Sequence, residues 1–266
     1  MTTTADHFHA LHAGPDVLLL PNAWDSASAA LMEDAGAKAV ATSSAAVAWA
    51  RGYADGDALP VSALIDVMAG IARVITAPLT ADIEGGYTDD LTELAETIKA
   101  VIGAGAVGIN LEDGRRDPDL HARKIATARA AAGQAGVDLF INARTDVYLA
   151  GLAEGEAALA ETLRRAALYA DAGASGIFVP MPIEEDILST LAAGIALPLN
   201  AMGRPGMPSA MRLAELGVRR LISATGPFRA AYGAMLAATR TYLAEGDTTG
   251  YAASAKDLPD LNARFG

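Results

Sequence analysis

The sequence predicts a single (β/α)8 barrel, and three observations lead to this prediction. Eight short apolar runs rich in strand-forming residues alternate with helix-type segments along the 266 residues. The runs are almost continuously apolar, as parallel strands covered on both faces are. The first run leads into "NAWDSASAAL", which lacks the glycine-rich loop typical of the competing fold, a doubly wound nucleotide-binding sheet.

The predicted strands recur at similar intervals, and a helix is expected between each pair. The strands cover residues 17–25, 39–44, 78–86, 108–114, 138–146, 176–181, 198–203 and 220–226. Helices are expected over stretches such as "LTELAETIKAVIGAG" and "EAALAETLRRAALYADAG". Several of these stretches end in glycine directly before the next strand, as in "EDAGAKAV", and glycine is the usual residue after the last turn of a helix.

No linker divides the chain, so we assign residues 1–266 to one domain, with 228–266 as a C-terminal helical extension. The extension predicts one long helix, a polar turn and a short terminal helix. It is longer than one barrel unit needs, and we expect it to pack on a neighbouring subunit of a homo-oligomer.

Composition excludes several kinds of protein. The net charge of −12 argues against nucleic acid and anionic membranes as partners. The absence of cysteine excludes disulfides, thiolate metal sites and a cysteine nucleophile. No apolar run is long enough to span a membrane and no signal peptide is visible, so we expect a cytoplasmic protein. The histidines of the N-terminal segment predict a solvated first helix rather than a metal cluster.

Polar side chains gather at the ends of the predicted strands, where barrel enzymes carry their chemistry. Asp82 and Glu84 lie two residues apart, so their side chains share one face of the strand. Glu112 ends the next strand and can converge on them. Three carboxylates in a partly buried opening repel one another unless a cation is present. Oxygen ligands of this kind predict Mg²⁺, with Mn²⁺ as a second possibility.

Further candidates stand at other strand ends. Arg144, in "FINARTDV", needs an anion, which is either a substrate carboxylate held by two parallel hydrogen bonds or the neighbouring Asp146 or Glu112. The segment "TSSAA" offers small residues and free backbone N–H groups for an anionic oxygen. His121 is expected on the surface at a helix start. Trp24 is a candidate for substrate contact at the end of the first strand.

Four segments in order resemble the isocitrate lyase / phosphoenolpyruvate mutase superfamily. They are "NAWDSASAALMEDAGAKAVATSSAAVAWARGYADGDALP", "TADIEGGY", "INLEDG" and "INARTDVYLAG". The resemblance runs from about residue 15 to residue 225. It implies a barrel whose terminal helix swaps between the subunits of a homodimer or homotetramer. It also implies Mg²⁺-dependent chemistry on small 2-oxo acids or their enol forms.

The resemblance also assigns roles residue by residue. Asp82, Glu84 and Glu112 match the metal-site acids, whose contacts to the ion can run through water. Asp55 matches a catalytic acid near metal and substrate, and Arg144 matches an arginine that grips the substrate. Residues that match substrate-binding positions are Ser43, Ser44, Ala45, Asp82 and Asn200.

One segment departs from the family pattern. Lyases of the superfamily carry a lysine-x-cysteine-glycine-histidine loop after the fourth strand, whereas this chain has the short "LEDGRRDPDLHARKIATAR". Arg115, Arg116 and His121 are its only obvious substitutes. Decarboxylation of an oxaloacetate-like acid needs the fewest acid–base groups, because CO₂ leaves without protonation. We therefore expect a carbon–carbon lyase or decarboxylase. The alternatives are a phosphonopyruvate or carboxyphosphonoenolpyruvate-type mutase or hydrolase, and a non-catalytic protein that binds a 2-oxo acid.

Overall fold

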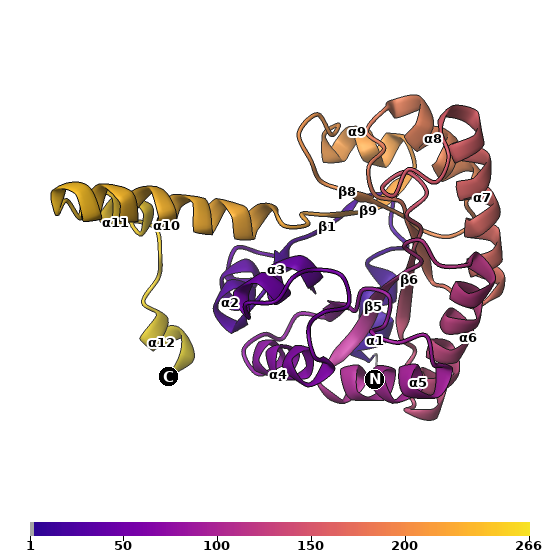
Figure 1. Cartoon of the computed structure of the whole chain (residues 1–266), viewed down its shortest axis with the longest axis horizontal. Helices are drawn as coiled ribbons and strands as arrows, with labels where there is room; N and C mark the ends of the chain where they lie inside the picture. Colours follow the sequence, from indigo (N-terminus) through magenta and orange to yellow (C-terminus); the bar gives the residue numbers. More distant parts are fainter. Residues whose placement is uncertain (1–2) are drawn as a thin grey trace.

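The computed structural model describes residues 3–266, and in this range nine parallel strands form one sheet. Strands β1 (Leu18–Leu20) and β2 (Asn22–Ala23) are the two halves of the predicted first strand. Pro21 separates them, because proline has no N–H to donate to a neighbouring strand. β1 pairs with β9 and β2 pairs with β3, so the two halves bring the ends of the sheet together. The result is a nearly closed barrel, which confirms the (β/α)8 prediction (Figure 1).

Every other predicted strand has a counterpart in the structure. The strands are β3 (Val40–Thr42), β4 (Leu79–Asp82), β5 (Ala106–Glu112), β6 (Phe140–Arg144), β7 (Gly176–Phe178), β8 (Leu199–Met202) and β9 (Val218–Ile222). Each pairs in parallel with the next along the barrel. The carboxyl ends of all the strands therefore meet at one opening.

Helices alternate with the strands, and most of them cover the outside of the barrel (Figure 1). They are α1 (Thr4–Ala10), α2 (Ser26–Asp34), α3 (Ser44–Ala50), α4 (Val61–Ala72), α5 (Leu91–Gly103), α6 (Pro118–Gln134), α7 (Gly155–Asp171), α8 (Glu185–Gly194), α9 (Ala210–Glu215), α10 (Gly226–Glu245), α11 (Thr249–Ser254) and α12 (Leu261–Phe265). Side-chain caps fix several starts: the Asp90 carboxylate accepts hydrogen bonds from two backbone N–H groups of the first turn of α5. The assignment of the whole chain to one domain stays a prediction.

Helix α1 closes the amino-terminal end of the barrel. Phe8 is fully buried, and a Cβ at Gly108 of β5 would lie 2.7 Å from its ring, so this strand must present glycine there. His12 stacks on Phe140 with ring centroids 4.0 Å apart and is only 3% exposed. The prediction of a solvated first helix is thus wrong for His12, because the chain turns inward after α1. His7 on α1 is exposed.

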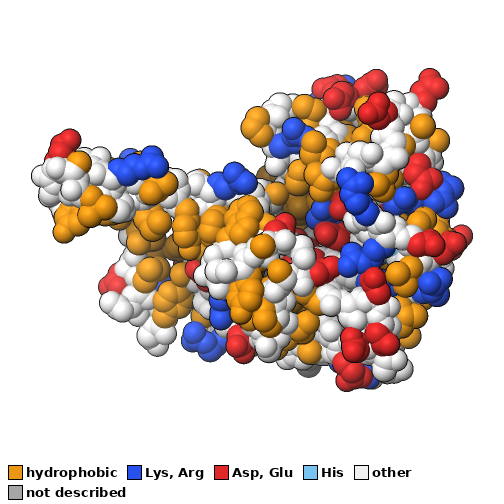
Figure 2. All heavy atoms as spheres, viewed as in Figure 1, with side chains coloured by type: hydrophobic (Ala, Val, Ile, Leu, Met, Phe, Trp, Pro, Cys, Tyr) orange, Lys and Arg blue, Asp and Glu red, His pale blue; other side chains and the backbone are white. Residues whose placement is uncertain are grey.

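Helix α10 leaves the barrel as a projecting arm, and α11 lies along it (Figure 1). Hydrophobic side chains gather on this arm (Figure 2). The exposed ones on α10 are Tyr232, Met235, Leu236, Tyr242 and Leu243. The chain returns to the barrel at α12, where Arg264 pairs with Asp34 at the end of α2. No helix of residues 3–266 has the length and hydropathy to cross a membrane.

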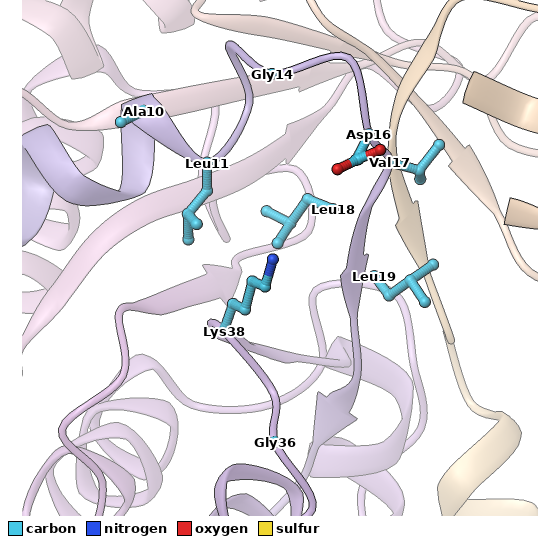
Figure 3. A pocket seen from close by; sticks show the side chains of 9 residues that line it. All are labelled: Ala10, Leu11, Gly14, Asp16, Val17, Leu18, Leu19, Gly36 and Lys38. Atoms are coloured by element: carbon cyan, nitrogen blue, oxygen red, sulfur yellow. The ribbon is translucent and has the colours of Figure 1, made fainter. Parts of the chain in front are cut away.

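The outer faces of β1 and β9 are left without a covering helix of their own because α10 projects away. Leu19 of β1 is 53% exposed. A cavity of about 390 Å³ lies here, lined by Leu19, Pro21 and Leu221 among others. A second cavity of about 380 Å³ lies between the α1–β1 connection and Lys38, with Asp16 on its wall (Figure 3). The first cavity is also lined by Leu20 and Ile222, the last residues of β1 and β9, whereas the second lies at the starts of β1 and β3.

The buried histidine gives a prediction about stability and pH. Burial, and then the charge of Arg220, lower the pKa of His12 to about 3, against 6.5 in an unfolded chain. Below pH 6.5 the imidazole of His12 is protonated in the unfolded state but stays neutral in the folded state. Stability therefore falls as the pH falls toward 3. The His12→Phe variant keeps an aromatic ring over Phe140 and has no group to protonate there. When the pH is lowered from 7.5 to 5.0, we expect the free energy of unfolding to fall by about 2 kcal/mol less in this variant than in the wild type.

Urea unfolding at the two pH values measures this difference, and ionisable groups elsewhere contribute equally to both proteins. The control is His7→Phe, at an exposed position on α1. Equal pH dependence in wild type and His12→Phe would contradict the prediction.

Candidate active site

The candidate site lies at the carboxyl ends of β4, β5 and β6. Asp82, Glu112 and Arg144 are the last residues of these three strands, and Glu84 follows Asp82 by two positions. In the strand register Asp82 is opposite Asn110, and Glu112 is opposite Arg144. The structure thus brings the acids and the arginine that the sequence singled out to one end of the barrel.

Asp82 is held by the segment that begins α3. The backbone N–H and the hydroxyl of Ser44 both donate to its Oδ2, at 3.2 and 3.0 Å. The Asp82 N–H donates in turn to the Thr42 hydroxyl at 2.8 Å. The backbone N–H of Ser44, which the sequence analysis expected to bind a substrate oxygen, therefore binds the Asp82 carboxylate in this structure. Asp82 is 9% exposed, and its other oxygen, Oδ1, accepts the N–H of Glu84 at 3.4 Å.

Glu84 receives its hydrogen bonds from the loop between α3 and α4. The backbone N–H groups of Gly56, at 2.8 Å, and of Asp57 donate to its Oε2. Its Oε1 is buried and has no hydrogen-bond partner in the part of the chain that the structure describes. Burial, and then the carboxylates of Asp55 and Asp82, raise the pKa of Glu84 to about 7. A buried carboxylate oxygen with no donor and with acidic neighbours is what a cation site requires.

Arg144 pairs with two acids. Its Nη1 lies 2.5 Å from Glu112 Oε2, and its Nε and Nη2 donate to the two oxygens of Asp146 at 2.6 and 3.0 Å. Both ion pairs that the sequence left open as alternatives to substrate binding are therefore present. The hydrogen bonds to Asp146 use two of the five N–H groups of the guanidinium, and Nη1 faces Glu112. Burial raises the pKa of Glu112, and Arg144 opposes that change.

The donor set suits a hard divalent ion held partly through water. Within residues 3–266 no three Asp, Glu, His or Cys side chains are arranged to hold a metal ion jointly. Mg²⁺ commonly takes one or two protein carboxylates and keeps several waters. Glu84, whose Oε1 has no hydrogen-bond partner among residues 3–266, and the neighbouring Asp82 are such carboxylates. The residues present are thus compatible with Mg²⁺, whose direct ligands stay a prediction.

The other predicted site residues lie around this centre at different depths. Asp55 is exposed at the rim, and the partial burial of its carboxylate and then Asp82 raise its pKa. Ser43 caps α3 through its hydroxyl, and Ala45 lies buried in the first turn of that helix. Asn200 is 1% exposed inside the barrel, and its side-chain atoms have no hydrogen-bond partner. Trp24 packs edge-on against Phe228 of α10 at 5.4 Å between centroids.

The three residues of the segment after β5 that the sequence offered as substitutes, Arg115, Arg116 and His121, are all engaged or buried. Arg115 donates to the carbonyl of Ala150, and Arg116 pairs with Asp57 and Asp89. His121 is fully buried against Tyr169, so its expected place on the surface is wrong. The reason is that α6 turns this residue toward α7. Burial lowers the pKa of His121 to about 4 and keeps the ring neutral at physiological pH.

A buried ion pair that the sequence did not reveal supports the Arg144 side of the site. Asp113 is 0% exposed and accepts hydrogen bonds from Arg165 at 2.8 Å and from the Tyr169 hydroxyl at 2.6 Å. Its other oxygen accepts the backbone N–H of Asp146 at 2.8 Å. Helix α7 thus fixes Asp146 and, through it, the orientation of Arg144. No sequence signal joins residues so far apart in the chain.

Comparison with known proteins identifies the family. The model of the phosphoenolpyruvate phosphomutase family matches residues 8–243, which includes every strand of the barrel and every acid of the site. This chain belongs to that family. The predicted membership of the isocitrate lyase / phosphoenolpyruvate mutase superfamily is therefore confirmed.

Relatives within the family have different names. An uncharacterized protein of Mycobacterium tuberculosis is 35% identical over 237 residues, covering 88% of this chain and 87% of the relative. An oxaloacetate decarboxylase of Ectopseudomonas mendocina is 33% identical over 199 residues, covering 70% and 64%. A crystal structure of a candidate phosphonomutase from Burkholderia cenocepacia has 41% identity and a TM-score of 0.86, covering 89% of this chain and 99% of that one.

The Asp113 network gives a prediction about stability. We expect Asp113→Ala to lower the free energy of unfolding by about 3–5 kcal/mol, because it leaves the buried Arg165 without its charge partner. Arg164→Ala, on the same helix, is the control and should cost less than about 1 kcal/mol, since its pair with Glu161 is exposed. Urea unfolding measures both changes. Similar losses in the two variants would contradict a special role for the buried pair.

Proposed function

We propose that this family member is an Mg²⁺-dependent lyase that cleaves or decarboxylates a small, oxaloacetate-like 2-oxo acid through an enolate. The observation that carries the proposal is the set of carboxylates at Asp82, Glu84 and Glu112 beside Arg144, at the opening of a barrel of this family. The name of the Ectopseudomonas relative, oxaloacetate decarboxylase, supports the substrate class.

Each residue has a defined part in this proposal. Asp82, Glu84 and Glu112 would hold the ion, in part through water, and Mg²⁺ bound there would supply positive charge to the substrate oxygens. Arg144 orients the substrate carboxylate through N–H groups that its pairs with Asp146 and Glu112 leave over. Ser43, Ser44, Ala45 and Asn200 are the proposed contacts for substrate oxygens, for which the Ser44 amide and hydroxyl would have to leave Asp82. Trp24 lies at the outer wall. Asp55, on the rim, is the proposed catalytic acid that contacts the substrate.

Decarboxylation is favoured over other cleavages by the segment after β5. Arg115 and Arg116 are engaged in hydrogen bonds, and His121 is buried and neutral. A reaction that needs one of these three residues as a general acid is therefore disfavoured. Loss of CO₂ from a β-keto acid leaves only an enolate, whose protonation can come from water.

A spectrophotometric assay of oxaloacetate consumption tests the proposal. We expect a chelator to remove the activity and Mg²⁺ or Mn²⁺ to restore it. Asp82→Ala should reduce kcat/KM by about 100-fold or more, because it removes a carboxylate of the proposed metal site. Asp171→Ala, at an exposed acid at the end of α7, is the control. Activity that resists both the chelator and Asp82→Ala would overturn the proposal.

A second candidate is phosphonate chemistry, supported by the candidate phosphonomutase at 41% identity. Phosphorus NMR with phosphonopyruvate separates the two, because a mutase or hydrolase changes the phosphorus signal and a decarboxylase does not. Calorimetry that shows 2-oxo acid binding without turnover of either substrate would instead indicate the non-catalytic binder.

We further propose that the protein forms a helix-swapped homodimer, or a homotetramer of such dimers. Two observations support it: α10 exposes a hydrophobic row away from its own barrel, and the outer faces of β1 and β9 lack a covering helix. An identical chain could place its α10 on that surface. In such a dimer the hydrophobic side chains that α10 exposes would be buried against the partner subunit.

Light scattering coupled to gel filtration tests the assembly. We expect Leu236→Glu, a buried charge in the proposed interface, to weaken the dimer by at least about tenfold, since burying an unpaired charge costs several kcal/mol. Met211→Glu, at a residue 75% exposed on α9, should leave the mass unchanged. A monomeric wild-type protein at micromolar concentration would contradict the swap.

A further inference from the structure

Two rim segments bind each other reciprocally beside the site. The backbone N–H groups of Gly56 and Asp57 donate to the Glu84 carboxylate. The Asp57 carboxylate in turn accepts the N–H groups of Gly85 and Tyr87, at 3.1 and 3.2 Å from its Oδ1. We call these contacts between residues 55–57 and 84–87 the rim contact. It fixes the carboxylate of Glu84 and the loop that carries Asp55 in one arrangement.

Arg116 completes the rim contact from a third segment. Its Nη2 donates to Asp57 Oδ2 at 2.6 Å, and its Nε donates to Asp89 at 2.8 Å. The guanidinium lies directly on Gly85, where a Cβ would overlap it. The fully buried ammonium of Lys124 holds the other side of this turn, at 2.7 Å from both the Gly85 carbonyl and Asp89. Two cations thus surround a turn that adjoins the proposed metal carboxylate.

The backbone of the rim contact needs such support. Asp57, Glu84 and Tyr87 all have φ near +60°, at 59°, 52° and 62°, in the left-handed region that non-glycine residues rarely adopt. Each such residue costs about 1 kcal/mol or more and persists only where surrounding contacts impose it. Since two of the three sit in one turn, loss of a supporting contact should let the turn relax.

We propose that Arg116 is a positioning residue whose ion pair with Asp57 holds Glu84 and Asp55 in place for metal and substrate. This proposal rests on the metal-dependent function proposed above. Arg116 does not act as an acid or base, since its guanidinium stays protonated and both of its ends are engaged. Its loss should therefore weaken Mg²⁺ and substrate binding more than it slows the reaction of bound substrate.

The first experiment measures Mg²⁺ affinity by isothermal calorimetry on the full chain without substrate. We expect Arg116→Met to weaken Mg²⁺ binding by about 10-fold or more, the range seen when residues that orient metal ligands are replaced. Arg116→Lys should recover part of the loss, because it keeps a charge near Asp57. The matched control is Arg212→Met, since Arg212 also bridges two carboxylates, Glu185 and Glu215, on outer helices.

The second experiment combines Arg116→Met with Asp57→Asn, which keeps the size of the side chain and removes its charge. If the pair acts as a unit, the double variant should bind Mg²⁺ within about twofold of the weaker single variant. Amide hydrogen exchange at residues 55–57 and 85–87 should accelerate in both single variants, since their N–H groups lose support. Where turnover is measurable, KM should rise about 10-fold with kcat changed less than about threefold.

The outcomes separate the two proposals. Unchanged Mg²⁺ affinity and unchanged exchange in a folded Arg116→Met protein would overturn the positioning role. Loss of thermal stability alone, with Mg²⁺ affinity and KM as in wild type, would also overturn it. Absence of oxaloacetate turnover in the wild type would contradict the proposed function, whereas calorimetry and exchange would still test the rim contact.

Discussion

Compensation of buried carboxylates is the constraint on which the carboxyl end of this barrel depends. Removing an ion from water costs several kcal/mol unless hydrogen bonds and opposite charge replace the lost hydration. Here Asp82 accepts hydrogen bonds from Ser44, and Glu84 accepts one from a backbone N–H of the loop between α3 and α4. Glu112 pairs with Arg144. Asp82 therefore fixes the start of α3, Glu84 fixes the loop between α3 and α4, and Glu112 fixes the end of β6. The arrangement of the rim follows from where these acids obtain their donors.

The buried carboxylates differ in how completely hydrogen bonds and ion pairs compensate them, and this difference indicates which of them are functional. Asp113 obtains a full set of partners from Arg165, Tyr169 and the Asp146 amide, which is typical of a structural acid. Glu84, by contrast, keeps one buried oxygen without a donor among acidic neighbours. Perturbed acids of the second kind concentrate at functional sites. Asp113 is thus an acid that supports the site, whereas Glu84 belongs to the site itself.

The sequence was sufficient for the barrel because each strand is a local pattern of apolar residues closed by a glycine-capped helix. It also placed Asp82, Glu84, Glu112 and Arg144 at strand ends, since parallel strands share one carboxyl end. It could not reveal that Arg116 pairs with Asp57, 59 residues away, because nothing local marks either residue as the partner of the other. The predictions that His12 and His121 are exposed were wrong for the same reason. Their burial depends on elements that pack over them, and the periodicity of the local sequence does not show those contacts.

A cation inside the barrel completes the charge balance beneath the acids. Arg220 is 1% exposed on β9, and its hydrogen bond in the described structure runs from Nη2 to Asn110 at 3.1 Å. Burial lowers the pKa of Arg220 to about 9, and Asp82 opposes the change, so the side chain remains protonated at neutral pH. The acid layer thus lies between a fixed positive charge below and the cations Arg144 and Arg116 at the rim. Because a bare guanidinium is costly to bury, Arg220 is stable there only with negative charge nearby, and the carboxylates of the mouth supply it. Acids and arginines of this barrel therefore stabilise one another, which allows the chain to keep several buried carboxylates at one opening.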